Sequence, residues 1–355
     1  MALTKVKAGG IESNLGRRNL ITNGAMQVAQ RGTSSTGLGA ADGYFTLDRF
    51  RMTHGATSAG RYTMTQSAVT DLSGFPNALK IDCTTADTSI AAGELLIIQH
   101  RVEGFNLQSL KATSTSTRAF TVSFYAKSNA SRAINTEIRF GNGTNRQATK
   151  THTIGTSWAR YTMTVPAASS TQIDNDNSHE MDLNFWIHAG STYQGGTVNS
   201  SLHAHDSTTR AAGIGSIFAS TDNTLEITGV QLEVGSQATP FEHRSFGEEL
   251  ALCQRYYQVI TDGDGFARNS GSALFGIKFQ NQMRANPAFS QTAVLAITNG
   301  HAWDKSQSSV SVAIIASRVL PTGAQLGFDN YSGLTQYQPV AINNTGGNIL
   351  ADAEL

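Results

Sequence analysis

The feature of this sequence that most constrains its fold is a strict alternation of apolar and polar residues. In residues 119–127, the apolar Phe120, Val122 and Phe124 alternate with polar side chains. Further runs with the same period cover residues 61–65, 160–165, 181–188 and 225–233. A period of two is typical of strands that bury one face and expose the other. Turn-forming Gly and Asn residues separate the runs, so we predict an all-β fold, an antiparallel β-sandwich.

One segment has the spacing of a helix instead. Residues 246–260 place apolar side chains on one face, Ser245 can cap the first turn, and Glu248 completes a capping box. We predict a linker helix over this whole range. Tyr256 and Tyr257 would then be neighbours on a helix, so at least one of them should point away from its own core.

The distribution of periodic runs along the sequence divides the chain into four parts. The first 18 residues have no periodicity, whereas the residues after about 261 return to short strand-like runs. The predicted parts are an extended N-terminal arm (1–18), the β-sandwich (19–245), the linker helix (246–260) and a smaller C-terminal β domain (261–355).

Composition excludes several classes of partner. The 26 basic and 26 acidic residues balance, and only 15% of the chain is charged, whereas 74 residues are Ser or Thr. Nucleic-acid binding needs clustered Lys and Arg, so we expect no nucleic-acid partner. No apolar run is long enough to cross a bilayer and the start lacks a signal peptide, so we expect synthesis in a cytoplasm and no membrane insertion. Cys83 and Cys253 are expected to be two buried thiols.

Motifs for catalysis and metal binding are weak. The sequence lacks a nucleophile elbow, a zinc-protease motif and a phosphate-binding loop, so we do not expect an enzyme. His203, His205 and Asp206 could hold a metal, and residues 174–177 with Glu180 could hold calcium, but polar loops explain both better. Residues 262–265 are expected to form a turn.

Sugar binding has better candidates. Aromatic side chains on the solvent face of a strand can stack on pyranose rings, with amide and imidazole groups as hydrogen-bonding partners. Alternation places Trp186 opposite the apolar face of its strand, so it needs a sugar, a neighbouring chain or a covering loop. The candidate carbohydrate-binding residues are Tyr125, Trp186, His188, Tyr193 and Gln194.

Several segments resemble a family of bacteriophage tail-fibre and receptor-binding virion proteins. Residues 18–32 (RNLITNGAMQVAQRG) and 44–50 (YFTLDRF) resemble the first strands of the galactose-binding-like jelly roll of that family. Residues 120–127 and 156–165 resemble its middle strands, and residues 229–244 resemble its last strand and exit. Residues 248–257 resemble the helix that follows. Residues 278–287 and 351–355 resemble its terminal β domain.

The resemblance implies a non-enzymatic structural protein of a virion, made in the host cytoplasm. It implies a homotrimeric short fibre whose arm, residues 1–18, contacts other virion proteins and whose jelly roll binds host cell-surface glycan. Because such jelly rolls are also similar to carbohydrate-binding modules that hold a structural calcium ion, it implies a Ca²⁺ site at Asn23 and Glu233. Two alternatives remain open: a capsid decoration or head-fibre protein without a sugar site, and a cellular carbohydrate-binding module protein.

Overall fold

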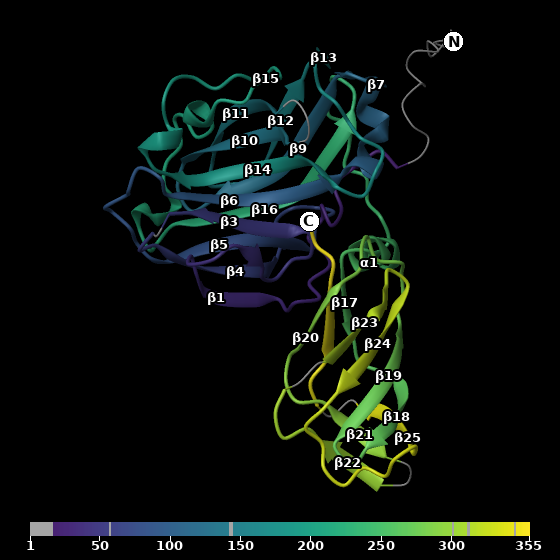
Figure 1. The fold of residues 1–355 in the computed structure, drawn as a ribbon. Helices are drawn as coiled ribbons and strands as arrows, with labels where there is room; N and C mark the ends of the chain where they lie inside the picture. Colours follow the sequence, from purple (N-terminus) through teal and green to yellow (C-terminus); the bar gives the residue numbers. More distant parts are fainter. Residues whose placement is uncertain (1–16, 57, 142–144, 300–301, 311–312, 344–345) are drawn as a thin grey trace, which may run out of the picture. The chain divides into compact units, whose positions relative to one another are not determined.

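The computed structural model describes residues 17–355, apart from 57, 142–144, 300–301, 311–312 and 344–345. The chain divides into two compact units. The first ends at Phe246 and also includes Leu355, and the second is Gly247–Glu354. Figure 1 shows strands in both units and labels the helix α1.

The first unit is built from two antiparallel sheets, as the alternation predicted. The six-stranded sheet has the order β1 (Ser34–Leu38), β4 (Arg61–Ala68), β5 (Asn77–Thr85), β16 (Thr224–Val234), β9 (Phe120–Ser128) and β12 (Ala159–Val165). The seven-stranded sheet has the order β15 (His203–Ala204), β11 (Arg146–Ile154), β10 (Arg132–Phe140), β14 (His179–Ala189), β6 (Leu95–Glu103), β3 (Phe50–Gly55) and β2 (Gly43–Tyr44). Smaller elements are β7 (Lys111–Thr113), β8 (Ser116–Thr117), β13 (Ala168–Ser169), and the 3₁₀ turns η2 (Gly104–Leu110), η3 (Ser191–Tyr193), η4 (Ser207–Thr209) and η5 (Ile217–Ala219).

The apolar faces of the two sheets form one core. Phe124 on β9 contacts Phe185 on β14 edge to face, with ring centroids 4.9 Å apart. Phe120 and Phe140 make a second pair between the sheets, at 6.4 Å. All four rings are fully buried, and such pairs add about 0.5–1.5 kcal/mol beyond the area that they bury. The alternation in residues 119–127 therefore assigned the buried face of β9 correctly.

A glycine permits an irregularity in β16. Gly229 has φ +59°, and the pairing of β16 with β9 shifts between Thr228 and Gln231. A Cβ atom at Gly229 would lie 2.8 Å from the Phe75 ring and 2.9 Å from the Tyr125 ring. Only glycine combines this left-handed backbone with such close aromatic neighbours.

The linker helix is shorter than the spacing predicted. Helix α1 covers Phe246–Gln254, and Tyr257–Ile260 form strand β17, which pairs with β26 (Ile349–Asp352). Aromatic and β-branched residues fit a pleated surface, and pairing with a distant strand overrides the local helical spacing here. Tyr256 and Tyr257 are both buried within the chain, so the expectation that one of them points outward is wrong.

The rest of the second unit is also β. One sheet has the order β17, β26 and β20 (Ala288–Gln291). The other has the order β22 (Ala302–Ser306), β21 (Ala296–Asn299), β25 (Pro339–Asn343), β18 (Asp264–Asn269), β19 (Ser272–Lys278), β24 (Gly323–Phe328) and β23 (Ala313–Leu320). Phe275 and Phe328 meet in its core with centroids 5.6 Å apart.

Two further observations concern the whole described chain. Cys83 and Cys253 are both buried, and they are not joined in a disulfide. None of the helices in the described residues has the length and apolar character needed to span a membrane.

Candidate functional site

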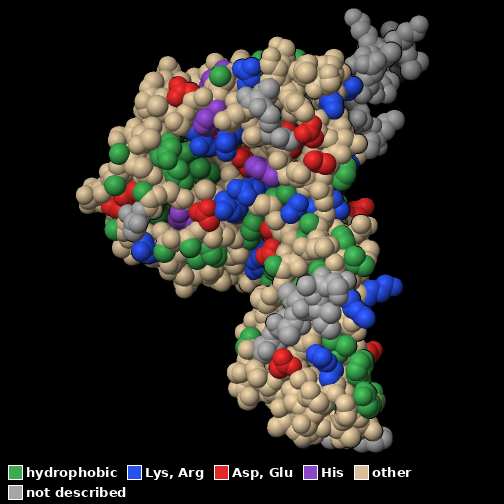
Figure 2. Space-filling view, viewed as in Figure 1, with side chains coloured by type: hydrophobic (Ala, Val, Ile, Leu, Met, Phe, Trp, Pro, Cys, Tyr) green, Lys and Arg blue, Asp and Glu red, His purple; other side chains and the backbone are tan. Residues whose placement is uncertain are grey.

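The candidate site is a hollow of about 550 Å³ on the outward face of the seven-stranded sheet. This volume is within the range of small-ligand sites. Basic side chains gather on this face beside histidine and acidic side chains (Figure 2). The hollow is lined by Thr53, Leu95, Ile97, Gln99, Arg101, Arg139, Gly141, Ser178, His179, Asp182 and Arg210.

Strand register places polar residues in rows across this face. Arg51 on β3 lies opposite Gln99 on β6. Gln99 lies opposite Asn184 on β14, which lies opposite Glu137 on β10. Since alternate residues of each strand share a face, these four side chains stand together on the side away from the core.

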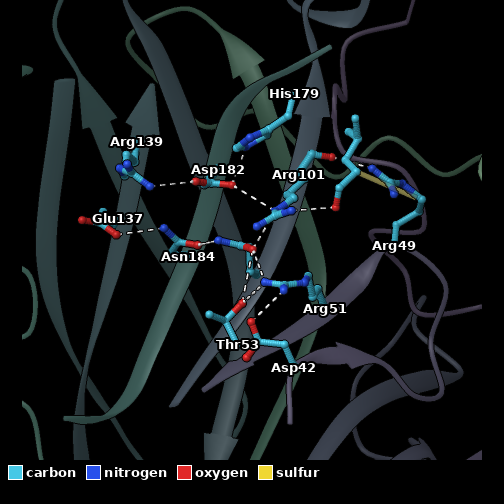
Figure 3. Close-up of polar contacts among 12 residues, drawn as sticks. Asp42, Arg49, Arg51, Thr53, Arg101, Glu137, Arg139, His179, Asp182 and Asn184 are labelled. Atoms are coloured by element: carbon cyan, nitrogen blue, oxygen red, sulfur yellow. Dashed lines mark hydrogen bonds and ion pairs between the residues drawn. The ribbon is translucent and has the colours of Figure 1, made fainter. Parts of the chain in front are cut away.

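Hydrogen bonds connect this row from strand to strand (Figure 3). Arg51 Nη1 donates to Gln99 Oε1 at 3.2 Å, and Gln99 Nε2 donates to Asn184 Oδ1 at 3.0 Å. Asn184 Nδ2 then donates to Glu137 Oε2 at 2.8 Å. Each buried amide is satisfied on both sides, so the row holds Gln99, which lines the hollow, in one orientation.

A second row holds two arginines around an aspartate. On the neighbouring strands, Arg101 and Arg139 lie opposite Asp182. Arg101 Nε lies 3.7 Å from Asp182 Oδ1, and Arg139 Nη1 lies 3.7 Å from Asp182 Oδ2. His179 Nε2 is closer, at 2.7 Å from Asp182 Oδ1. Figure 3 shows the three side chains converging on the Asp182 carboxylate.

A buried ion pair closes one end of the site. Glu137 is fully buried and accepts two hydrogen bonds from Arg210, at 2.7 Å to Nε and 2.8 Å to Nη2. Trp186 Nε1 donates to the same carboxylate at 2.9 Å. Burial alone would lower the pKa of Arg210, but the charge and hydrogen bonds of Glu137 outweigh it and raise that pKa. Arg210 therefore stays charged, and its position is fixed by a bidentate contact.

The opposite end is held by Asp42. Arg51 Nη2 lies 2.7 Å from Asp42 Oδ2, and the backbone N–H of His54 donates to Asp42 Oδ1 at 2.6 Å. Arg51 Nη1 also donates to Thr53 Oγ1 at 2.6 Å. Arg51 is thereby held by protein groups at both ends of its guanidinium.

The structure does not bring the five predicted sugar-binding residues together as an open platform. Trp186 does point away from the sandwich core, but its side chain is fully buried with Ile97, Ala189, Ala211 and Ile214. A loop that follows β14 covers the ring, so stacking of a sugar on Trp186 is excluded in this structure. Tyr193 belongs to this cover and packs on Trp186, with centroids 5.3 Å apart.

The other three predicted residues serve structural roles. His188 is fully buried and hydrogen-bonds to Ser216 at 2.7 Å and Glu94 at 3.2 Å. Gln194 is exposed and donates to the backbone carbonyl of Ala189 at 2.5 Å. Tyr125 lies on the six-stranded sheet, half-buried against the Phe75 ring at 5.1 Å.

The predicted calcium residues are likewise occupied by protein groups. Asn23 donates to the carbonyl oxygens of Val28 and Asp48 and accepts from the N–H of Val28. Glu233 accepts from Gln231 through Oε1, and from Thr239 through both carboxylate oxygens. In this structure their side-chain oxygens accept hydrogen bonds from protein groups, and the calcium assignment of Asn23 and Glu233 stays a prediction.

The other metal candidates form turns. Asp206 caps η4 by accepting from Thr208 N at 2.9 Å, and Asp176 accepts from Ser178 N at 2.9 Å. Within the described ranges, no group of three or more His, Cys, Asp or Glu side chains is arranged to hold a metal ion.

Sequence reasoning missed the arginines of the hollow. Arg51 and Arg139 each stand between two apolar residues, and Arg101 precedes Val102, so alternation indicates which face of its strand each arginine occupies. What brings them together is the order of β3, β6, β14 and β10, which joins residues far apart in the sequence.

Comparison with known proteins gives similarities of fold. No family model matches the sequence, and no curated protein matches it. A solved structure described as "CBM4 structure and function" overlaps 61% of this chain and 99% of its own, with 12% identity and a TM-score of 0.31. The structure of TmCBM61 in complex with β-1,4-galactotriose overlaps 62% of this chain and 100% of its own, with 8% identity and a TM-score of 0.29.

A viral structure is among the similar ones. The enzymatically active domain of tailspike protein 4 from bacteriophage CBA120 overlaps 61% of this chain, with 13% identity and a TM-score of 0.31. The match spans 21% of that tailspike chain. The β-sandwich is thus similar, at low structural overlap, to carbohydrate-binding modules and to a phage tailspike domain.

Proposed function

We propose that this chain is a glycan-binding structural protein of a bacteriophage virion, and that the hollow on the seven-stranded sheet is its glycan site. The observation that carries the glycan part is the fixed polar lining of that hollow. Gln99 and Asn184 are held in one orientation, while Arg101 and Arg139 are about a quarter to a third exposed. Sugar hydroxyls and acidic groups are bound by guanidinium groups of this kind, and the buried amides fix the residues around them.

The virion part rests on the sequence segments that resemble phage fibre proteins. In this proposal the chain acts without enzymatic activity, forms a homotrimer, and contacts other virion proteins through residues 1–18. Most of that arm lies outside the described residues. The trimer contact of this proposal does not involve Tyr256 and Tyr257, because both are already buried within one chain.

Two measurements test this function. Light scattering of the purified chain at micromolar concentration should give about three times the 37.8 kDa of one chain, and a clean monomer would contradict the trimer. A glycan array probed with the full chain should show binding that is lost in the double variant Arg101→Gln/Arg139→Gln. Retained binding in that variant would place the glycan site elsewhere, and release of reducing sugar from a bound polysaccharide would contradict the absence of enzymatic activity.

A further inference from the structure

The solvent-facing layer of the hollow is cationic, whereas its acids lie beneath the surface. The side chains of Arg139 and Arg101 are 31% and 25% exposed, but the side chains of Asp182 and Glu137 are 1% and 0% exposed. Three arginines and one aspartate line the hollow. A ligand that enters it therefore meets guanidinium groups before it meets the side chains of Asp182 or Glu137, and the protein oxygen already bound to Arg101 Nη1 is that of Leu355, at 2.7 Å.

Arg139 retains most of its donors for a ligand, and Arg101 retains part of its donors. Each approaches Asp182 at 3.7 Å, which is beyond hydrogen-bonding distance. Arg139 also donates from Nε to Asn145 Oδ1, at a long 3.4 Å. Arg101 is more committed: its Nε donates to Gln99 Oε1 at 2.9 Å and its Nη1 donates to Leu355 O at 2.7 Å, so its remaining N–H groups are the ones left for a ligand.

Stacking cannot supply the affinity here. Among the described residues that line the hollow there is no Phe, Tyr or Trp. The aromatic ring nearest to it in the network, Trp186, is fully buried, and the Arg210 guanidinium lies over it at 4.5 Å. Recognition must come from charged hydrogen bonds, which are roughly twice as strong as neutral ones.

We propose that the hollow binds an acidic saccharide, and that Arg101 and Arg139 hold the carboxylate of a uronic or nonulosonic acid residue. This inference rests on the proposed glycan-binding function and specifies its substrate class. The two arginines come from the strands on either side of β14 and converge on one point, so both can reach the same ligand group. A planar carboxylate matches the fork of a guanidinium group. Hydroxyls of the same sugar can be bound by Thr53 and Ser178, which line the hollow and are not buried.

The test uses saccharides in pairs that differ only in charge. Calorimetry of the full chain would compare fragments of polygalacturonate, oligosialate and hyaluronan with their methyl-esterified or carboxyl-reduced counterparts. O-sulfated neutral oligosaccharides and polyglutamate distinguish a sugar carboxylate from sulfate and from charge alone. We expect at least one acidic saccharide to bind about tenfold or more tightly than its neutral counterpart, and tighter than the sulfated sugar and polyglutamate.

Other outcomes overturn the inference in distinguishable ways. Equal or preferential binding of the neutral counterparts contradicts the acidic class but leaves the glycan function standing. Preferred binding of sulfated sugars contradicts the carboxylate, and preferred binding of polyglutamate or failure of every saccharide contradicts both proposals.

Substitutions of Arg139 test whether this residue contributes to binding of the acidic saccharide. Arg139→Gln should weaken binding of the acidic saccharide about tenfold or more. Arg139→Lys should keep only part of the parental affinity, because lysine lacks the planar fork of the guanidinium group. The control is Arg118→Gln, which removes an exposed arginine between β8 and β9 and should bind normally. Melting temperatures near that of the parent exclude unfolding. Equal affinities of Arg139→Gln and Arg118→Gln would overturn the assignment of Arg139.

Discussion

The guanidinium of Arg210 lies over the indole ring of Trp186, with its Cζ 4.5 Å from the ring centroid, and both side chains donate to the Glu137 carboxylate. The indole is therefore enclosed by charge on one side and by the apolar side chains of the covering loop. This enclosure changes the role of the one tryptophan that the alternation places on the solvent side of a strand, from a ligand platform to part of the fold.

Trp186→Ala should therefore destabilise the protein, rather than only weaken binding. Removal of a buried tryptophan costs about 3–5 kcal/mol of unfolding free energy, and Glu137 also loses a donor. Urea unfolding would measure the loss. Trp158→Ala is the control, because that side chain is half-buried just before β12 of the other sheet and should cost much less. A Trp186→Ala variant with parental stability would show that the ring is not enclosed.

Part of the fold could be predicted from the sequence. Alternation identified the strands and the buried side of β9, because period two follows directly from strand geometry. It could not show that Tyr257 leaves the helix, since β17 depends on pairing with Ile349–Asp352 at the far end of the chain.

The site was harder to predict than the fold. The covering of Trp186 depends on the path of an irregular loop that has no periodic signal. The row from Gln99 through Asn184 to Glu137 depends on strand order, which places residues 85 and 47 positions apart in contact. Local pattern carries no information about such pairings.

Stability should fall in mild acid because of His152. Burial between Phe124 and Tyr161, helped by the nearby Lys150 charge, lowers the pKa of His152 from 6.5 to about 4. The unfolded chain then binds more protons between these two values, so stability is complete above pH 6.5 and declines as pH falls toward 4. Protonation of His152 lowers the free energy of unfolding by about 3 kcal/mol over this range.

Urea unfolding at pH 7 and pH 4.5 would measure this loss. His152→Leu should reduce the difference between the two pH values by about 2–3 kcal/mol, while His203→Leu, on the two-residue strand β15, should leave most of it. The same pH difference in His152→Leu and the parent would contradict this account.

Gly229→Ala should lower the free energy of unfolding by more than backbone strain alone would. A left-handed φ costs a non-glycine residue roughly 1–2 kcal/mol, and the new Cβ would also press on the Phe75 and Tyr125 rings. Gly213→Ala is a matched control, because Gly213 has φ +81° and no atom within 4 Å of the added carbon. We expect Gly229→Ala to be the less stable of the two by about 1–3 kcal/mol; equal losses in thermal unfolding would show that the rings move aside.

Deletion of residues 1–17 should separate folding from assembly. The backbone N–H groups of Arg18 and Asn19, which donate to Glu242, remain in the truncated chain, so its melting temperature should match that of the parent. Incorporation into particles, measured by mass spectrometry of purified virions, should be abolished and restored by the full chain. Normal incorporation of the truncated chain would contradict the proposed role of the arm.

The most direct test of the central claim is a crystal structure of the full chain soaked with the acidic saccharide that binds most tightly. The account predicts a sugar in the hollow of the seven-stranded sheet, with its carboxylate within hydrogen-bonding distance of Arg101 and Arg139. A sugar bound elsewhere, for example beside Tyr125 or Trp158 on the six-stranded sheet, would contradict it.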